Sequence, residues 1–322
     1  MTASKTIPAI AGVGNVISFA YREGAVYEKF TQQPFNELIL SWNGFRPAQG
    51  CWTFYVSLFQ SEWSPFLEYA QWGATWQKTF HSSTTTATSY QDAVTPKSGL
   101  STGFRIVVKP ALGADISTLH ELHVCTSDTS QFQIEPVPAL ASLHLNGIFP
   151  HCQMLLPHPR HRDLCSPTST TAAINFLWKK KLVDPLVFAS KVHDNEFDIY
   201  GNWILNTAAA YEALEGNYQT YVARLSNFSA AHAALAKGLP VVVSVKGPLP
   251  GGATPYSNGH LLLLIGYDSL EKTVLCMDPA FSSDRETIVS YPIAPFLQAW
   301  GRRRNLAYFF EPKFFISRSN SR

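Results

Sequence analysis

The feature that most constrains this chain is a change of pattern near residue 140. Before it, short apolar runs bounded by Gly and Pro recur without a helical period; after it, a helical pattern comes first and more strand-like runs follow. Strands grouped at one end and a mixed set at the other are typical of α+β proteins. We expect a loose N-terminal segment over residues 1–20, an antiparallel β-sandwich over 21–135 and an α+β domain over 145–318.

The first part contains strand-like runs rich in aromatic and β-branched residues, such as NELILSW and CWTFYVSLF. The run GFRIVVKP alternates, which places Phe104, Ile106 and Val108 on one face of a strand. The polar, Thr-rich stretch HSSTTTATSYQDAVTPKSG predicts an exposed hairpin and loop.

Tryptophans are frequent in this first part, and their rings could stack on sugars, although large aromatic residues more often fill sandwich cores. The five are Trp42, Trp52, Trp63, Trp72 and Trp76. Contact of the sandwich with a glycan or peptide therefore stays open.

The second part opens with helical signals. In SAAHAALAKGLP, Ser229 is a candidate N-cap, Gly238 suits a left-handed C-terminal cap, and Pro240 blocks continuation of the helix. Three buried-strand patterns follow, namely PVVVSV, HLLLLIGYD and TVLCMDP. This order of helices and then strands supports the α+β assignment.

Composition and charge exclude several classes of function. The 322 residues are 46% hydrophobic and 15% charged, and the formal net charge of +2 gives no reason to expect a nucleic-acid partner. The basic run Arg302-Arg303-Arg304 is expected to solvate a helix end or a turn. No apolar run approaches the length of about 20 residues that spans a membrane, so no membrane span is predicted.

Cysteine usage indicates free thiols. The five cysteines are Cys51, Cys125, Cys152, Cys165 and Cys276. Their odd number and the lack of a Cys-x-x-Cys pair favour a reducing compartment. The N-terminal stretch shows no convincing signal peptide, so we expect a cytoplasmic protein or one exported without a standard signal, and the sequence does not choose between them.

One cysteine has a distinctive setting, in the stretch HRDLCSPTSTTAAINFLW. Pro167 suits the first turn of a helix, and the apolar residues beyond it have helical spacing, which places Cys165 at the helix N-terminus. The neighbouring hydroxyls, on Ser166, Thr168, Ser169 and Thr170, could satisfy free N–H groups there. A helix N-terminus favours a thiolate, although a buried and inert cysteine fits the same pattern.

A thiolate nucleophile needs an imidazole and a group that orients the imidazole. His260 follows Ser-Asn-Gly and opens the strand HLLLLIGYD, and the next strand, TVLCM, ends in Asp278. If the two strands pair, Asp278 returns to the side of His260. Each residue could instead simply end its strand. Together, Cys165, His260 and Asp278 form a candidate triad in the chain order of papain-type enzymes.

These residues also carry a family resemblance. The stretches HCQMLLPHPRHRDLCSPTST, GNWILNTAAAYEA, YVARL, GLPVVVSV, SNGHLLLLIGYD and MDPA resemble the stand-alone bacterial members of the bacteriocin-processing cysteine peptidase family, family thirty-nine of the papain-fold peptidases. The resemblance covers most of residues 145–310, and more weakly the β-rich region before it. It implies a papain-like domain, a peptide or protein substrate and no cofactor, and it does not imply leader removal coupled to export.

Residue by residue, the resemblance gives Cys165 the role of nucleophile, His260 that of general base and later acid, and Asp278 that of third member. An upstream Gln should help to bind the oxyanion. In the best-known members this Gln lies six residues before the cysteine, where this chain has Pro159; the nearest candidate, Gln153, lies twelve before, so the segment between must loop out.

Substrate contacts are predicted from two further motifs. Asn202 and Trp203 of the GNW motif are expected in the core or the cleft wall, and all four of Asn202, Trp203, Asn258 and Gly259 are candidates for substrate contact.

Several alternatives to a peptidase stay open. The same acyl-enzyme chemistry serves acyl transfer or deamidation if the acceptor or the amide differs, so an isopeptide or a side-chain amide could be the substrate. The chain could also be a non-catalytic glycan- or peptide-binding protein on the same scaffold.

A zinc site is the remaining alternative, and its candidate ligands are Cys152, His158, His161 and Cys165. Their spacing matches no familiar zinc pattern, so no metal is predicted.

Overall fold

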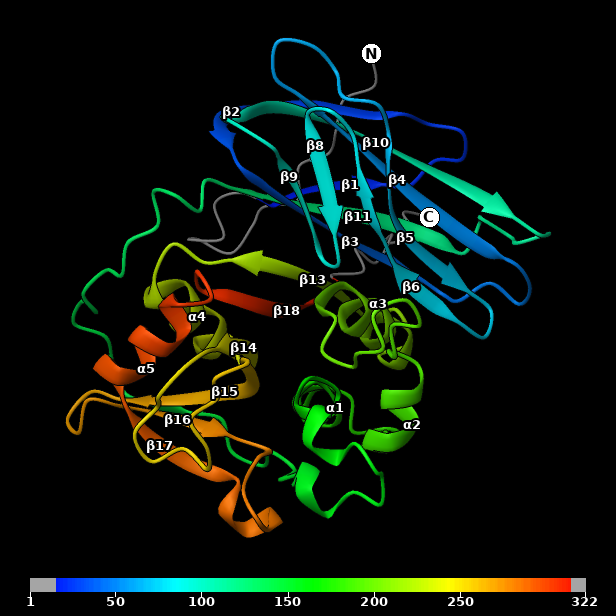
Figure 1. Ribbon diagram of the computed structural model, residues 1–322. Helices are drawn as coiled ribbons and strands as arrows, with labels where there is room; N and C mark the ends of the chain where they lie inside the picture. The colour runs from blue at the N-terminus through cyan, green and yellow to red at the C-terminus, as the bar shows by residue number, and fades with distance from the viewer. Residues whose placement is uncertain (1–15, 314–322) are drawn as a thin grey trace, which may run out of the picture.

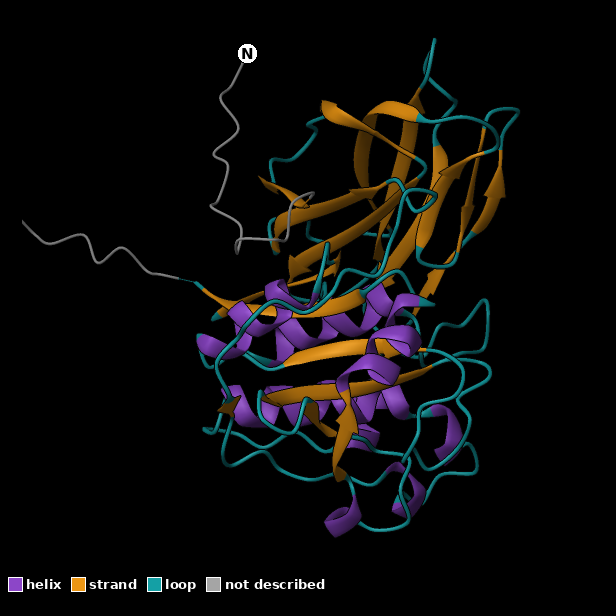
Figure 2. Cartoon of the chain, turned by 90° about the vertical axis from the view of Figure 1, so that its left-hand side faces the viewer, coloured by secondary structure: helices purple, strands orange, loops and turns teal. Residues whose placement is uncertain are grey.

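The computed structural model describes residues 16–313, and it stacks two parts on each other (Figure 1). Strands β1–β11 make up one part, and the helices with β12–β18 make up the other. Within the described residues, every strand pairing is antiparallel. The prediction of a mixed helix-and-sheet protein with mainly antiparallel sheets is thus confirmed. Figure 2 shows that the helices belong to the part built on the third sheet.

Two sheets form the first part, with strand orders β1-β11-β3-β9-β8-β7 and β2-β10-β4-β5-β6. Their strands are β1 (Val16–Ala20), β2 (Tyr27–Phe35), β3 (Glu37–Gly44), β4 (Cys51–Phe59), β5 (Leu67–Gly73), β6 (Gln77–Thr79), β7 (His81–Ser83), β8 (Ala87–Tyr90), β9 (Ala93–Pro96), β10 (Ser101–Ala111) and β11 (Leu119–Ser127). The predicted apolar face of β10 is confirmed, since Phe104, Ile106 and Val108 are buried. Burial alternates along much of β10, whereas β3 and β4 are buried almost throughout.

Two expectations about this part are wrong. Residues 16–20 are not loose, because they form β1 and pair with β11; residues 1–15 lie outside the described residues. The Thr-rich stretch is not an exposed hairpin throughout: it forms β7, β8 and β9, and Asp92 in the β8–β9 turn is buried. Long-range contacts of β1 and Asp92 decide both cases, and the local pattern does not contain them.

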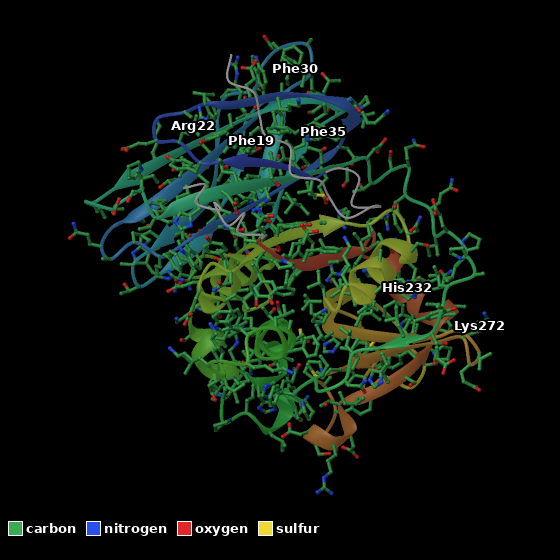
Figure 3. All side chains as sticks on the ribbon, turned by 180° about the vertical axis from the view of Figure 1, so that it is seen from behind. Phe19, Arg22, Phe30, Phe35, His232 and Lys272 are labelled. Atoms are coloured by element: carbon green, nitrogen blue, oxygen red, sulfur yellow. The ribbon has the colours of Figure 1, made fainter. Side chains whose placement is uncertain are left out.

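The tryptophans mostly fill the core. Trp42, Trp52 and Trp72 are fully buried, so they cannot stack on a sugar, and only Trp63 and Trp76 are partly exposed. Seen from behind, Phe30 lies at the outer end of the first part, and His232 and Lys272 lie in the other part (Figure 3). Phe30 is exposed, and Phe59 and Trp63 lie close to its ring.

The third sheet has the order β13-β18-β14-β15-β16-β17, with β12 paired to β15. Its strands are β12 (Leu143–His144), β13 (Tyr218–Arg224), β14 (Val241–Val245), β15 (His260–Asp268), β16 (Thr273–Met277), β17 (Ile288–Pro292) and β18 (Leu306–Pro312). The helices are α1 (Cys165–Leu177), α2 (Pro185–Ser190), α3 (Trp203–Ala213), α4 (Phe228–Ala236) and α5 (Ile293–Gly301). Three short 3-10 helices accompany them, η1 (Gln153–Leu155), η2 (His161–Asp163) and η3 (Asp284–Glu286).

The predicted helix over SAAHAALA is confirmed as α4, with one correction at its start. The N-cap is Asn227, and Ser229 lies inside the first turn. Gly238 has φ +79 and its N–H donates to Leu235 O, so the predicted left-handed position after the helix is confirmed. No helix among residues 16–313 combines the length and the apolar character needed to cross a bilayer.

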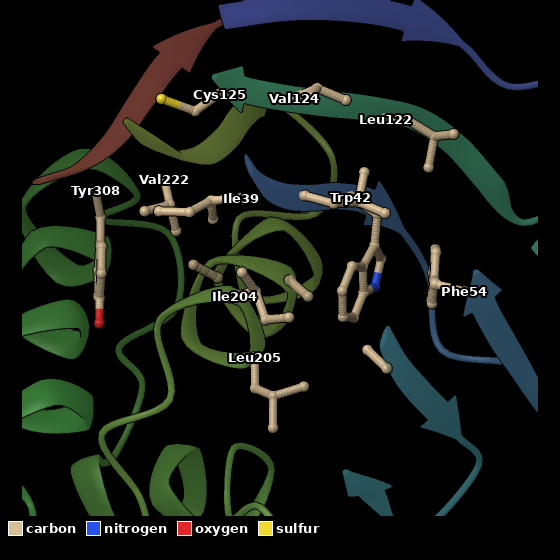
Figure 4. Packing of buried hydrophobic residues seen from close by; sticks show 14 of the residues in the cluster. Ile39, Trp42, Phe54, Leu122, Val124, Cys125, Ile204, Leu205, Val222 and Tyr308 are labelled. Atoms are coloured by element: carbon tan, nitrogen blue, oxygen red, sulfur yellow. The ribbon is translucent and has the colours of Figure 1, made fainter. Parts of the chain in front are cut away.

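The two parts share a continuous core (Figure 4). Ile39 and Trp42 of β3 pack in one cluster with Ile204 of α3 and Val222 of β13. Buried polar contacts cross the same boundary: Asn43 Nδ2 donates to Thr220 O at 2.7 Å. A shared hydrophobic core with buried hydrogen bonds holds the two parts in a fixed relative position. The first part can therefore contribute to a site located beside α3.

Candidate active site

Helix α1 begins at Cys165, as the sequence predicts. Ser169 Oγ donates to Leu261 O at 3.0 Å, which ties the helix to β15, and Ser166 Oγ lies 3.0 Å from Tyr308 Oη of β18. These hydroxyls therefore fix the helix on the sheet and do not cap it as expected; no side chain caps its N-terminus. Cys165 is partly exposed, and it lies at the helix N-terminus, where backbone N–H groups have no partner inside the helix.

His260 and Asp278 meet at the ends of two paired strands. Strand β15 begins at His260, and β16 runs antiparallel to it and ends one residue before Asp278. His260 Nε2 donates to Asp278 Oδ1 at 2.8 Å, and the His260 ring also lies close enough to the Cys165 side chain for each to shift the pKa of the other. The structure thus brings together the three side chains that the sequence singles out, with the imidazole in the middle.

Asp278 is fully buried and every partner around it is a donor. In addition to the His260 N–H, its Oδ1 accepts the backbone N–H of Ala280 at 3.0 Å. Its Oδ2 accepts the hydroxyls of Tyr256 at 2.6 Å and Tyr291 at 2.7 Å. Tyr256 also stacks on the His260 ring, with 4.2 Å between ring centroids and 7° between planes. Neither tyrosine was predictable from the sequence, because nothing local in its setting marks it.

The three ionisable groups shift one another's pKa. Burial acts to raise the pKa of the Cys165 thiol, but the hydrogen bond and the charge of His260 outweigh it, so the pKa falls below its ordinary value. Burial acts to lower the pKa of His260, but Asp278 and Cys165 raise it to about 10. Burial opposes the charge on Asp278 too, yet His260 and the tyrosine hydroxyls lower its pKa. All three shifts act in the direction that favours the charged form of each group.

A cavity of about 780 Å³ opens over Cys165 and His260. Its walls come from both parts of the molecule: the segment before α1, the loop before β15, the start of α3, and Gln91 with Asp92 from the β8–β9 turn. The size is that of a ligand site rather than a packing defect. The first part of the chain therefore helps to form the same cavity as the candidate triad.

Asp92 joins the two parts at this cavity. Its Oδ1 accepts the N–H of Trp203 at 2.6 Å and that of Ile204 at 3.3 Å, at the start of α3. Burial raises the pKa of Asp92 to about 7, although these two N–H groups act in the opposite direction. Asp92 was not predictable as a site residue, because the Thr-rich stretch around it has the pattern of an exposed hairpin and loop.

Gln153 lines the cavity, so the segment between it and Cys165 does loop out as the spacing requires. Its amide, however, is turned into that loop: Nε2 donates to His161 O at 3.1 Å and to Arg162 O at 2.9 Å. Both amide hydrogens are engaged, so in this conformation Gln153 has no free donor for an oxyanion. The arrangement instead supports η2, the short helix directly before Cys165.

The predicted substrate-contacting residues divide into two groups. Trp203, Asn258 and Gly259 line the cavity. Asn202 does not: it is fully buried, its side chain accepts the N–H of Leu205 as the N-cap of α3, and it donates to Asp194 Oδ2 at 3.0 Å. The expectation that Asn202 contacts substrate is wrong. An asparagine directly before a helix is a preferred N-cap, and this capping role needs no ligand.

The four residues considered for zinc do not converge. Cys152 Sγ donates to Phe281 O at 2.8 Å, and the two ring nitrogens of His158 lie against Arg160 N and Tyr200 Oη. Over residues 16–313, no group of three or more His, Cys, Asp or Glu could hold a metal ion. The Cys165 thiol has its imidazole partner instead.

Comparisons with known proteins bear on the second part of the chain. Residues 146–308 match the model of the Peptidase_C39 like family. A crystal structure of a candidate C39-like peptidase from Bacillus anthracis is similar to this chain, at 19% identity and a TM-score of 0.41. The match covers 54% of this chain and 99% of that one. A comparison with curated proteins found no match.

Proposed function

This chain belongs to the Peptidase_C39 like family, and from this premise we propose that it is a cysteine peptidase that cleaves amide bonds in peptides or proteins, with Cys165 as its nucleophile. One observation carries the proposal: the Cys165 thiol lies beside the His260 imidazole in a cavity large enough for a peptide segment, and the Asp278 carboxylate accepts the Nε2–H of that ring.

The proposed reaction has two steps. The Cys165 thiolate attacks the carbonyl carbon of the amide, and the imidazolium of His260 gives its proton to the leaving amine as the C–N bond breaks. Water then attacks the thioester, with His260 as base, and releases the acid and the thiol. Asp278 holds the ring in one tautomer and stabilises the imidazolium.

The oxyanion of the tetrahedral intermediate needs donors that are free before the reaction. We assign this role to the backbone N–H of Cys165, at the N-terminus of α1. Gln153 does not serve, because its amide hydrogens are donated to His161 O and Arg162 O. A cysteine that opens a helix, a histidine that opens a strand and an acid on the neighbouring antiparallel strand also support a papain-like description of residues 145–313.

The test is peptide cleavage by purified protein and by two cysteine variants. Cys165→Ala should lose at least about 10⁴-fold in kcat, because triad members act as a unit. Cys51→Ala is the matched control: Cys51 is buried in β4, away from the cavity, and this variant should retain cleavage. Iodoacetamide should alkylate Cys165 before the four buried cysteines. Undiminished cleavage by Cys165→Ala overturns the proposal.

A further inference from the structure

The charged side chains around the cavity are unevenly paired. Arg160 is satisfied, since Nε binds Asp163 at 2.8 Å and Nη1 binds Asp198 at 2.6 Å. Two other arginines of the lining, Arg162 and Arg303, have no ion pair within 4.0 Å among the residues that the structure describes. Arg162 is exposed and can be solvated, whereas Arg303 is partly buried. The unpaired charge that calls for an explanation is therefore that of Arg303.

Arg303 lies directly beside the candidate triad. It follows α5, and its guanidinium covers the backbone of Gly259, the residue before His260: a Cβ on Gly259 would come within 2.0 Å of Arg303 Nη2. Nη2 donates to Asn258 O at 3.0 Å, which holds the side chain in place. Gly259 is needed here twice, for this approach and for its φ of +99. The expectation that the basic run only solvates a turn is thus wrong for Arg303.

The guanidinium has donors left over. Its Nε is buried and has no hydrogen-bond partner in residues 16–313. Burial and the nearby Arg224 lower the pKa of Arg303, which shows that its surroundings do not compensate the charge fully. Asp92 attracts it from across the cavity, but that carboxyl is bound to two N–H groups of α3. A buried donor without a partner is costly, so the site is incompletely satisfied, and Arg303 lines the cavity, where a ligand can engage the other N–H groups of its guanidinium.

We propose that Arg303 binds a carboxylate of the substrate, so that the enzyme selects peptides with an acidic group close to the scissile amide. This inference rests on the proposed function, because it concerns the substrate of the same cavity. A guanidinium presents two parallel N–H donors that match the two oxygens of a carboxylate, which a lysine or an amide cannot reproduce. The carboxylate can belong to an Asp or Glu side chain or to the C-terminus of a peptide.

The first test uses the wild-type protein alone. Peptides differing only by Glu or Gln at each position flanking the cleaved bond are compared, each as the C-terminal acid and the C-terminal amide. We expect kcat/KM to be about tenfold or more higher for one acidic form than for its neutral partner. A preference for Glu identifies a side-chain carboxylate, and a preference for the free acid identifies a terminal one. Equal rates for every pair overturn the inference.

The second test assigns the preference to Arg303. In Arg303→Gln the ratio of kcat/KM for the acidic peptide to kcat/KM for the neutral peptide should fall to about one. In Arg303→Lys this ratio should be intermediate. The neighbouring Arg302→Gln is the matched control, since Arg302 donates to Lys246 O outside the cavity, and it should keep the wild-type ratio. Since the readout is a ratio within one preparation, partial loss of folded protein does not alter it. An unchanged ratio in Arg303→Gln overturns the inference.

Two further outcomes separate this inference from other readings. If Arg303→Gln slows both substrates equally and shifts the pH dependence of Cys165 alkylation, the guanidinium acts on the nucleophile and the substrate proposal is wrong. If the wild type cleaves no peptide and Cys165 resists alkylation, the proposed function fails, and the inference fails with it. Cleavage without acidic preference leaves the proposed function intact and removes only the inference.

Discussion

Asp278 and Asp92 are buried aspartates at the same cavity, one from the third sheet and one from the β8–β9 turn, and their pKa values shift in opposite directions. Asp278 accepts from an imidazole, two tyrosine hydroxyls and an N–H, which together outweigh burial and lower its pKa. Asp92 accepts from two N–H groups through a single oxygen, so burial dominates and raises its pKa to about 7. Burial alone therefore does not decide the charge of an acid; the number and charge of its donors do.

The contrast separates two tasks. The surroundings of Asp278 keep a permanent anion behind His260, which fits a group that must stabilise an imidazolium. Those of Asp92 tolerate a neutral acid, which fits a group that joins two parts of a protein. The following variants test this division, beginning with the largest expected effect.

Asp278→Asn should reduce kcat by about 10³- to 10⁴-fold, because the neutral amide no longer stabilises the imidazolium and permits the wrong tautomer. The pKa of His260, raised to about 10 mainly by the charge of Asp278, should fall, so the alkaline limb of the kcat/KM profile should move to lower pH. Asp268→Asn, at the other end of β15, is the control. Wild-type kcat in Asp278→Asn would show that the two aspartates do not differ as described.

Asp92→Asn should change stability rather than chemistry. Because the folded-state pKa of Asp92 is above its ordinary value of 3.8, its contribution to stability is fully present below that pH and is lost as the pH rises through about 7. The asparagine side chain of the Asp92→Asn variant does not titrate, so the variant does not lose stability in this way. The unfolding free energy of the variant minus that of wild type should therefore increase from pH 4 to pH 7, by at most about 4 kcal/mol.

Urea unfolding at several pH values measures this difference, and other titrating groups cancel in the comparison. Asp115→Asn is the control. Hydrogen bonds with Ser117 lower the pKa of this exposed aspartate, so its effect on the pH dependence of stability falls below this pH range. A constant difference between Asp92→Asn and wild type would contradict the assignment of Asp92.

Tyr256→Phe and Tyr291→Phe should have the smallest effects, about tenfold or less in kcat, since each removes one of several donors to Asp278. With one donor fewer, Asp278 becomes more basic and holds the His260 proton more tightly, so the alkaline limb should move to higher pH. A role in folding alone would leave that limb in place. Tyr267→Phe, on the far part of β15, is the control.

Much of the local structure was predictable from the sequence. β4 and β15 have the bounds of CWTFYVSLF and HLLLLIGYD, and α1 begins at Cys165, because alternation, a proline in the first turn and runs of apolar residues act within a few neighbours. The positions of His260 and Asp278 followed from pairing two adjacent strands, which is also a short-range argument.

Other features depend on residues far apart in the chain. Tyr291 and Asp92 show no local signal, and Arg303 looked like part of a solvated basic run; each acquires its role from a contact across the fold. Gln153 and Asn202 are the opposite case. Their residue types suit catalysis or binding, but in the fold their side chains are hydrogen-bonded to backbone groups.

By itself, the sequence determined that this protein combines helices with antiparallel sheets, where several of its strands lie, and three residues able to form a nucleophile, a base and an orienting acid. Only the tertiary structure decided that the β8–β9 turn lines the same cavity, that Asp278 is held by two tyrosines, and that an arginine with unused donors covers Gly259. The physical reason is range: periodicity and capping act over a few residues, whereas burial and the pairing of charges depend on segments that only folding brings together.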